Sequence, residues 1–161
     1  MEASHIVYLL QPHFSNARKR LVKSPKLYFL DTGLACSLIG IDSPDELFGS
    51  EFYGALFEAA VVGEVLKTLY ARGETPHLTF WRDSNKREID ILVEKGLRAV
   101  KAIEIKPSAT FRPTYFDILA SVATTGPSLP PEACSVVYGG DETMGAARGR
   151  LVSWRETSSL V

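Results

Sequence analysis

The stretch EFYGALFEAAVVGEVLKTLYA at residues 51–71 is followed by HLTFWR at 77–82, REIDILVE at 87–94 and AVKAIEIK at 99–106. Polar residues interrupt the first stretch so rarely that it predicts a long helix buried on most of its surface, and Arg72-Gly73 supplies its stop. The other three stretches predict a meander of β-strands, because turn-forming residues separate them. This helix and this meander form the nucleus of the predicted fold.

Three more elements are expected after this nucleus. Pro113 to Val122 predicts a helix with proline in its first turn, and Cys134 to Tyr138 predicts a strand that pairs parallel after a helical crossover. Leu151 to Trp154 predicts a last edge strand. The order helix, three strands, helix, strand favours an α/β fold with a mixed sheet.

The first forty residues predict two strands, His5 to Leu10 and Lys26 to Leu30, and then a short helix from Thr32 to Ile39. These pieces are too few and too short to close a hydrophobic core alone. We therefore divide the chain into an N-terminal extension, residues 1–45, and a main domain, residues 46–161.

The composition is that of an ordinary globular chain. Of the 161 residues, 45% are hydrophobic and 23% are charged, and the formal net charge is −1. That charge excludes a general polycation that binds nucleic acid by bulk charge. Two cysteines without metal-ligand spacing and a start without a signal-peptide pattern indicate a reduced, cytoplasmic protein. No apolar stretch reaches the length that crosses a membrane.

One basic cluster stands out near the start of the chain. It consists of Arg18, Lys19, Arg20, Lys23 and Lys26. Either these residues form a solvated surface linker, as most charge runs do, or they form a strap that contacts phosphate groups or a partner. We favour the surface linker.

The pairing of the second and third meander strands determines which side chains meet. Opposition of apolar side chains favours two pairs, Ile89 with Ile105 and Ile91 with Ile103. This register implies a three-residue loop at 96–98 and puts Asp90 across from Glu104, with their Cβ atoms roughly 5 Å apart. A shorter loop would slide Glu104 several residues, on the order of 10 Å, away from Asp90.

Two carboxylates at such a distance can share one small cation, and their hard oxygen ligands suit Mg²⁺ or Mn²⁺. Lys106 emerges on the same side two residues beyond Glu104, where a lysine can orient water or neutralise charge during phosphodiester hydrolysis. Glu58 interrupts a mostly apolar helix, where a carboxylate is costly unless it is paired or metal-bound. The alternative is a solvated hairpin face, with Glu58 on a partly exposed helix stripe.

Four short motifs resemble a known superfamily: LFE at 56–58, FWR at 80–82, EID at 88–90 and IEIK at 103–106. In this order and spacing they resemble the PD-(D/E)XK nucleases, which have the restriction-endonuclease-like fold. More closely, the chain is similar to the domain of unknown function that follows an AAA-type ATPase module in many bacterial and archaeal proteins. KRLVKSPK at 19–26 and YFLDTGLA at 28–35 resemble the same family, so the match covers most of the chain.

This resemblance implies a role for each site residue. It implies that Glu58 is the acid of the helix, Asp90 and Glu104 are the metal-binding acids, and Lys106 is the catalytic lysine. It also implies that Arg82 contacts a phosphate or a base of DNA, the alternative being an ion pair with the acid that follows it. The implied cofactor is Mg²⁺ or Mn²⁺.

The resemblance further implies a partner. Family members carry an ATPase upstream, but its phosphate-binding loop, Gly-x-x-x-x-Gly-Lys followed by Ser or Thr, does not occur here. HIVYLL at 5–10 resembles the final strand of a winged-helix linker, so we expect residues 1–45 to be its remnant and the chain to be a fragment or a truncated product. We expect a homodimer where loss of the partner exposes apolar surface.

Two functions are compatible with these features. The first is a divalent-metal-dependent nuclease-like domain that acts on DNA. The alternative is a non-catalytic module that docks on nucleic acid or protein and transmits contacts to an AAA-type ATPase. A metabolic enzyme with a small-molecule pocket has little support, because the dinucleotide-binding glycine pattern and the Gly-x-Ser-x-Gly motif are both absent from the sequence.

Overall fold

The structure, a computed structural model, describes residues 5–13, 24–96, 98–122 and 126–161. Its elements, in chain order, are β1 (Val7–Pro12), β2 (Lys26–Phe29), α1 (Thr32–Leu38), α2 (Pro44–Gly49), α3 (Tyr53–Ala71), β3 (Leu78–Arg82), β4 (Glu88–Lys95), β5 (Arg98–Lys106), η3 (Pro113–Phe116), α4 (Asp117–Val122), η4 (Pro131–Ala133), β6 (Cys134–Tyr138), β7 (Met144–Ala146), β8 (Gly149–Ser153) and η5 (Trp154–Ser159). Four members of the basic cluster, between Arg18 and Lys23, lie outside the described residues.

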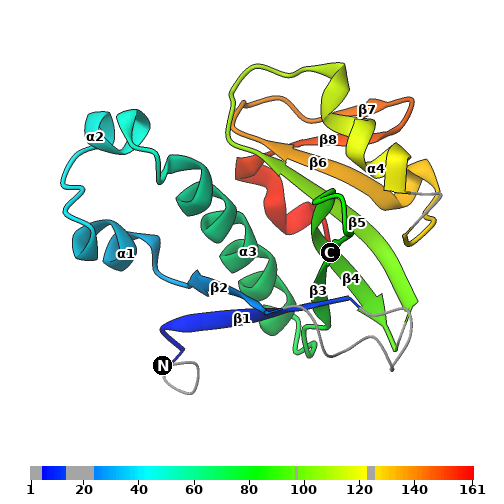
Figure 1. Ribbon diagram of the computed structural model, residues 1–161, viewed down its shortest axis with the longest axis horizontal. Helices are drawn as coiled ribbons and strands as arrows, with labels where there is room; N and C mark the ends of the chain where they lie inside the picture. Colours follow the sequence, from blue (N-terminus) through cyan, green and yellow to red (C-terminus); the bar gives the residue numbers. More distant parts are fainter. Residues whose placement is uncertain (1–4, 14–23, 97, 123–125) are drawn as a thin grey trace.

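The described strands form one mixed sheet of eight strands in the order β2-β1-β3-β4-β5-β6-β8-β7 (Figure 1). β1 pairs parallel with β3 and antiparallel with β2, so the strands of the first thirty residues extend the sheet of the meander. β6 pairs parallel with β5 on one side and with β8 on the other. The chain is therefore a mixed α/β protein.

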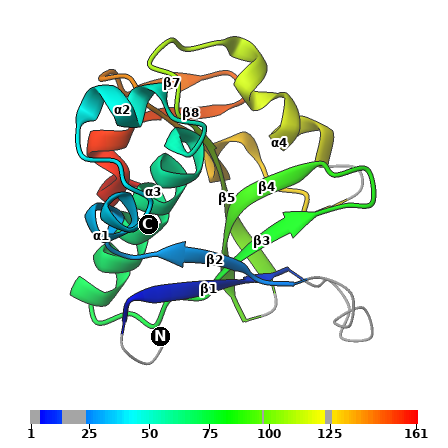
Figure 2. The ribbon, with the colours of Figure 1, turned by 60° about the vertical axis from the view of Figure 1, so that its left-hand side comes forward.

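Two hydrophobic cores lie on opposite faces of this sheet. Val62, Val65 and Leu66 of α3 belong to the first core, which also takes in residues of β1 to β6 and β8. Phe116 of η3 and Leu119 of α4 belong to the second core. Figure 2 shows α1, α2 and α3 on one side of the sheet and α4 on the other. Helices thus cover both faces, and α3 is the central one.

The predicted nucleus is confirmed. α3 begins at Tyr53 and ends at Ala71, and Gly73 after it has a φ of 71°, which suits glycine. The three meander strands lie within about two residues of the predicted ranges, and β6 pairs parallel with β5 as expected. The stretch predicted as one helix from Pro113 opens as a 3₁₀-helix and continues as α4.

One prediction about the end of the chain is wrong. β8 is not an edge strand, because it pairs with β6 on one side and with β7 on the other. β7 has three residues and α2 has six, with no residue of α2 buried. Elements this short carry too little hydrophobic periodicity to be recognised from sequence.

β4 carries one extra residue relative to β3. The pairs on either side of Phe80 are Thr79 with Leu92 and Trp81 with Ile89. Two steps along β3 thus face three steps along β4, so Asp90 and Ile91 together oppose Phe80 in a β-bulge. Ile89 and Ile91 consequently pack in different cores, although alternation predicts that they share a face.

The pairing of β4 with β5 agrees only in part with the predicted register. Ile91 pairs with Ile103 as predicted, and the ladder continues from there toward the loop. On the other side of this pair, the backbone N–H of Ile105 donates to Asp90 Oδ2 at 2.8 Å, so a side chain takes the place of the expected Ile89 partner. A bulge at Val100 shifts the pairing beyond it, so Lys95 pairs with Arg98, a residue of the predicted three-residue loop.

None of the helices in the described ranges is long and apolar enough to span a membrane. Cys36 and Cys134 are both free thiols.

The end of β5 passes close to the backbone after β6. A Cβ atom on Gly139 would lie 2.4 Å from the carbonyl oxygen of Pro107, whereas one on Gly145 would meet nothing within 4 Å. We expect Gly139→Ala to lower the free energy of unfolding by about 1–3 kcal/mol, because overpacking forces the backbone apart. Gly145→Ala should stay within about 0.5 kcal/mol of wild type. Urea unfolding of both variants tests this, and equal stabilities would refute the close approach.

Candidate functional site

Three carboxylates from two elements converge beside the sheet. Glu58 comes from the second turn of α3, and Glu88 and Asp90 come from the start of β4. One carboxylate oxygen of each lies within 4.8 Å of those of the other two. The bulge in β4 explains how Asp90 joins this group, because an extra residue re-aims a side chain that strict alternation would direct elsewhere. We call Glu58, Glu88 and Asp90 the acidic cluster.

The ammonium group of Lys26 lies among these carboxylates. Its Nζ is 2.8 Å from Glu58 Oε1 and 3.7 Å from Asp90 Oδ1, and it also contacts Glu88 Oε1. Burial lowers the pKa of Lys26, but the carboxylates outweigh burial and raise that pKa above its usual value. Lys26 is therefore a charged ammonium that neutralises part of the acidic cluster.

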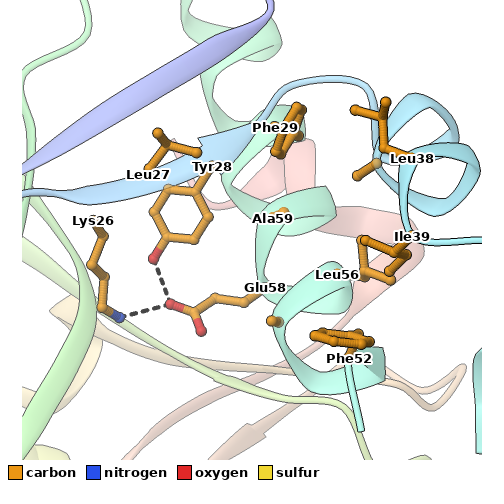
Figure 3. Close-up of a pocket in the computed structure, with 12 residues that line it drawn as sticks. Lys26, Leu27, Tyr28, Phe29, Leu38, Ile39, Phe52, Leu56, Glu58 and Ala59 are labelled. Atoms are coloured by element: carbon orange, nitrogen blue, oxygen red, sulfur yellow. Dashed lines mark hydrogen bonds and ion pairs between the residues drawn. The ribbon is translucent and has the colours of Figure 1, made fainter. Parts of the chain in front are cut away.

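Tyr28 adds a second donor from the same strand. Its hydroxyl donates to Glu58 Oε1 at 2.5 Å, and Figure 3 shows Lys26 and Tyr28 both directed toward that carboxylate. Burial, followed by the charge of Glu58, raises the pKa of Tyr28, so the phenol stays protonated. β2 thus supplies both groups that hold the Glu58 carboxylate in place.

Asp90 is partly buried, with its side chain 14% exposed, and it faces several negative charges. Burial is the largest cause that raises the pKa of Asp90 well above its usual value, followed by the charges of Glu104 and Glu58. Lys26 and the N–H of Ile105 act in the opposite direction. A carboxylate in such a position would be stabilised by any further cation that reached it.

Glu104 and Lys106 of β5 form an ion pair. Lys106 Nζ lies 2.6 Å from Glu104 Oε1, while Glu104 Oε2 is buried and accepts no hydrogen bond from the described residues. Burial raises the pKa of Glu104 to about 7, although Lys106 lowers it. Burial lowers the pKa of Lys106, yet Glu104 raises it by more, so Lys106 remains charged. An orphaned buried carboxylate oxygen is unusual, because it costs free energy without a partner.

Arg82 stands at the rim of the site. Its Nε contacts Glu88 Oε2 rather than the following Asp83, which pairs with Arg87. The Arg82 side chain is 48% exposed, so part of its guanidinium faces solvent. Trp81, its neighbour, is buried in the second core.

The predicted site residues lie in one region of the fold, but the contacts among them differ from those predicted from the sequence. Asp90 is grouped with Glu58 and Glu88, while Glu104 forms its pair with Lys106. Sequence reasoning missed Glu88, Lys26 and Tyr28 as members of the site. Alternation along β2 does put residues 26 and 28 on one face, but no local pattern indicates that this face meets α3.

The residue types present suit a divalent cation. Carboxylate oxygens are the ligands that Mg²⁺ and Mn²⁺ prefer, and Glu104 Oε2 has unused acceptor capacity. Asp90, Glu104, Glu58 and Glu88 are the residues that could hold such an ion. The Lys26 ammonium currently takes up the charge of three of them.

An apolar groove of about 410 Å³ adjoins the acidic cluster. Lys26, Tyr28 and Glu58 line its inner end, and residues of β2, α1 and α3 line the rest (Figure 3). Leu38 and Phe52 are 66% and 47% exposed, which is high for apolar residues. This groove makes the site amphipathic, with charge at one end and hydrocarbon at the other.

Fold and site together define a mixed α/β domain that carries partly buried acids beside an ammonium group. The family described as "Domain of unknown function (DUF4143)" matches residues 53–156, so the chain belongs to this family. A second family of unknown function, DUF8612, matches residues 1–45. No solved structure matches the chain.

Two curated relatives are uncharacterized proteins of Mycobacterium bovis and Mycobacterium tuberculosis. Each is 38% identical to this chain over 105 residues, which cover 65% of this chain and 23% of the relative. The chain thus spans about a quarter of the length of these relatives.

The raised pKa of Glu104 predicts a specific pH dependence in metal-free protein. Between pH 4.5, its ordinary pKa, and about pH 7, the folded state binds more protons than the unfolded state. Stability therefore falls as pH rises through this interval, by on the order of 3 kcal/mol from this group. Glu104→Gln should remove that loss. The free energy of unfolding of this variant should therefore increase relative to that of wild type as pH rises.

Urea unfolding across this pH interval, in the presence of a chelator, measures the difference. Glu64→Gln is the matched control, because Glu64 is exposed on α3 and pairs only with Lys67 among the described residues. The pH-dependent gain on wild type should be larger for Glu104→Gln than for Glu64→Gln. Parallel pH profiles for wild type and Glu104→Gln would contradict the burial of a carboxylate with a raised pKa.

Proposed function

We propose that this chain is a divalent-metal-dependent phosphodiester hydrolase domain of the restriction-endonuclease-like class that acts on DNA. The single observation that carries the proposal is the grouping of the Asp90 carboxylate with those of Glu58 and Glu88. The ion pair of Glu104 with Lys106 lies close enough that the charge of Glu104 helps to raise the pKa of Asp90. Buried carboxylates with raised pKa values cluster at functional sites, because folding alone does not favour them. The motif order in the sequence supports the same class.

The acids of the site would hold the metal. Asp90 and Glu104 are the principal ligands in this proposal, and Glu58 completes the ligand set or holds a water molecule. A bound Mg²⁺ or Mn²⁺ would supply a Lewis acid that polarises the phosphodiester and generates hydroxide. Burial of the carboxylates strengthens their hold on such a cation, because water screens the attraction less there.

Lys106 and Arg82 supply the positive charge that a phosphodiester requires. Lys106 keeps its proton and is only 34% exposed, so its ammonium can neutralise negative charge that develops on the phosphate. Arg82, at the exposed rim, is the proposed phosphate contact. Glu104 positions Lys106 through their ion pair.

A second candidate function is a non-catalytic interaction module. The observation that favours it is the apolar groove, together with the exposure of Leu38 and Phe52, which line it. Exposed apolar patches of this kind mark surfaces that bind other macromolecules. In this alternative the chain docks on DNA or on protein and transmits contacts to an AAA-type ATPase module, and a homodimer is a further candidate for covering the groove.

A cleavage assay on labelled single- and double-stranded DNA with Mg²⁺ or Mn²⁺ tests the proposal. We expect Asp90→Ala and Lys106→Ala each to reduce cleavage by about 100-fold or more, because the first removes a proposed metal ligand and the second removes the charge that stabilises the transition state. Asp117→Asn is the matched control, because Asp117 is exposed on α4 and pairs with Arg148. This variant should cut at the wild-type rate.

The outcomes separate the two candidate functions. Cleavage that survives both Asp90→Ala and Lys106→Ala would remove this site from the reaction. If wild type and all variants bind DNA equally and none of them cuts, the interaction module is the better account. Circular dichroism of each variant shows whether a loss of cleavage reflects chemistry or unfolding.

A further inference from the structure

The Lys26 ammonium lies where a cation bound by the acidic cluster would lie. It contacts a carboxylate oxygen of Glu58 and one of Glu88, and it is 3.7 Å from Asp90 Oδ1. Its side chain is only 18% exposed, so water does little to screen these contacts. A protein ammonium thus already performs the charge compensation that a metal ion would perform for these three acids.

Lys26 is anchored differently from the acids that surround it. It is the first residue of β2 and pairs with Leu10 of β1, at the edge of the sheet, whereas the acids belong to α3 and β4. A lysine ammonium is a compact charge on a flexible four-carbon stem, so it can leave a site without movement of its strand. The contact with the ring of Phe80, at 5.4 Å from its centroid, holds the ammonium less firmly than the carboxylates do.

The two kinds of cation exclude each other. An ammonium in contact with Glu58 and Glu88 would repel a divalent ion bound by the same oxygens, and the repulsion is strong in a poorly hydrated site. The Oε1 atom of Glu58 has no lone pair left for a metal ion while Lys26 is in place, because it already accepts from Lys26 and from Tyr28. Glu104 Oε2, buried and without a described partner, remains as acceptor capacity that the ammonium does not use.

We infer that Lys26 is a built-in counter-ion of this site, which keeps the acidic cluster assembled without metal and which a divalent cation must displace in order to bind. This inference rests on the proposed metal site. It makes Lys26 a positioning residue that regulates metal loading. The long separation along the chain between Lys26 and the acids makes the arrangement a property of the folded protein alone.

Mn²⁺ binding to the full chain, measured by calorimetry, tests the inference. Lys26→Met removes the charge and retains much of the stem, so we expect Mn²⁺ to bind at least tenfold more tightly than to wild type. Lys26→Arg retains the positive charge and should bind no more tightly than wild type. Lys67→Met is the matched control on the exposed side of α3, where Lys67 pairs with Glu64, and it should leave the Kd unchanged.

A second measurement uses wild-type protein alone, so it does not depend on the folding of a variant. Reductive methylation followed by mass spectrometry reports how accessible each lysine amine is. We expect saturating Mn²⁺ to increase the labelling rate of Lys26 severalfold, because its amine leaves the ion pairs. Lys67 is the internal reference and should label at the same rate with and without Mn²⁺.

The outcomes of the two measurements show whether Mn²⁺ displaces the Lys26 ammonium from the acidic cluster. Unchanged or weaker Mn²⁺ binding by folded Lys26→Met, or unchanged labelling of Lys26 in Mn²⁺-bound wild type, overturns the inference and leaves the metal site standing. If neither wild type nor Lys26→Met binds Mn²⁺, the metal site itself is overturned and the inference fails with it. Tighter binding by Lys26→Met together with faster labelling supports displacement.

Discussion

The ammonium of Lys26 holds together three carboxylates that would otherwise repel one another. Glu58, Glu88 and Asp90 bring negative charge into a partly buried space, and each gains from contact with, or proximity to, the same positive charge. Removal of one partner from such a group leaves the rest buried and uncompensated, which is costly. The relative placement of β2, α3 and β4 at this point therefore depends on one ion-pair network.

The second constraint is the bulge in β4. An extra residue opposite Phe80 exchanges the faces of the strand, so Ile89 joins one core and Ile91 the other. At the same point the carboxylate of Asp90 accepts the backbone N–H of Ile105, which joins β4 to β5 through a side chain. Bulges occur often beside functional sites because they aim a side chain where alternation would not. Here the bulge brings an acid of the sheet toward an acid of the helix.

Charged and apolar side chains meet near the N-terminal end of α3. Glu58 faces Lys26 and Tyr28 on one side, and the apolar groove begins on the other, lined by α1, α3 and β2. The same helix face thus takes part in the site and in an exposed surface that another molecule can cover. For a family of unknown function, this links the two candidate activities physically, because whatever binds the groove also contacts the residues that hold Glu58.

Much of the framework follows from local sequence. The apolar run of α3, the alternation of the meander strands and the parallel strand after the crossover were all predictable, since each depends on the periodicity of neighbouring residues. The pairing of Ile91 with Ile103 followed as well, from apolar opposition. The short elements α2 and β7 did not, because six and three residues carry too little hydrophobic periodicity to be recognised.

The candidate site also has features that the sequence predicts and features that only the tertiary structure decides. Sequence by itself determined which acids and which lysine, among them Asp90, Glu104 and Lys106, lie on adjoining strands, because strand spacing is regular. Only the tertiary structure decided that Asp90 turns toward Glu58 and that Lys26 lies between them. The physical reason is that a one-residue bulge reverses the face of a strand, and that contacts between distant segments arise from packing, which no local periodicity encodes.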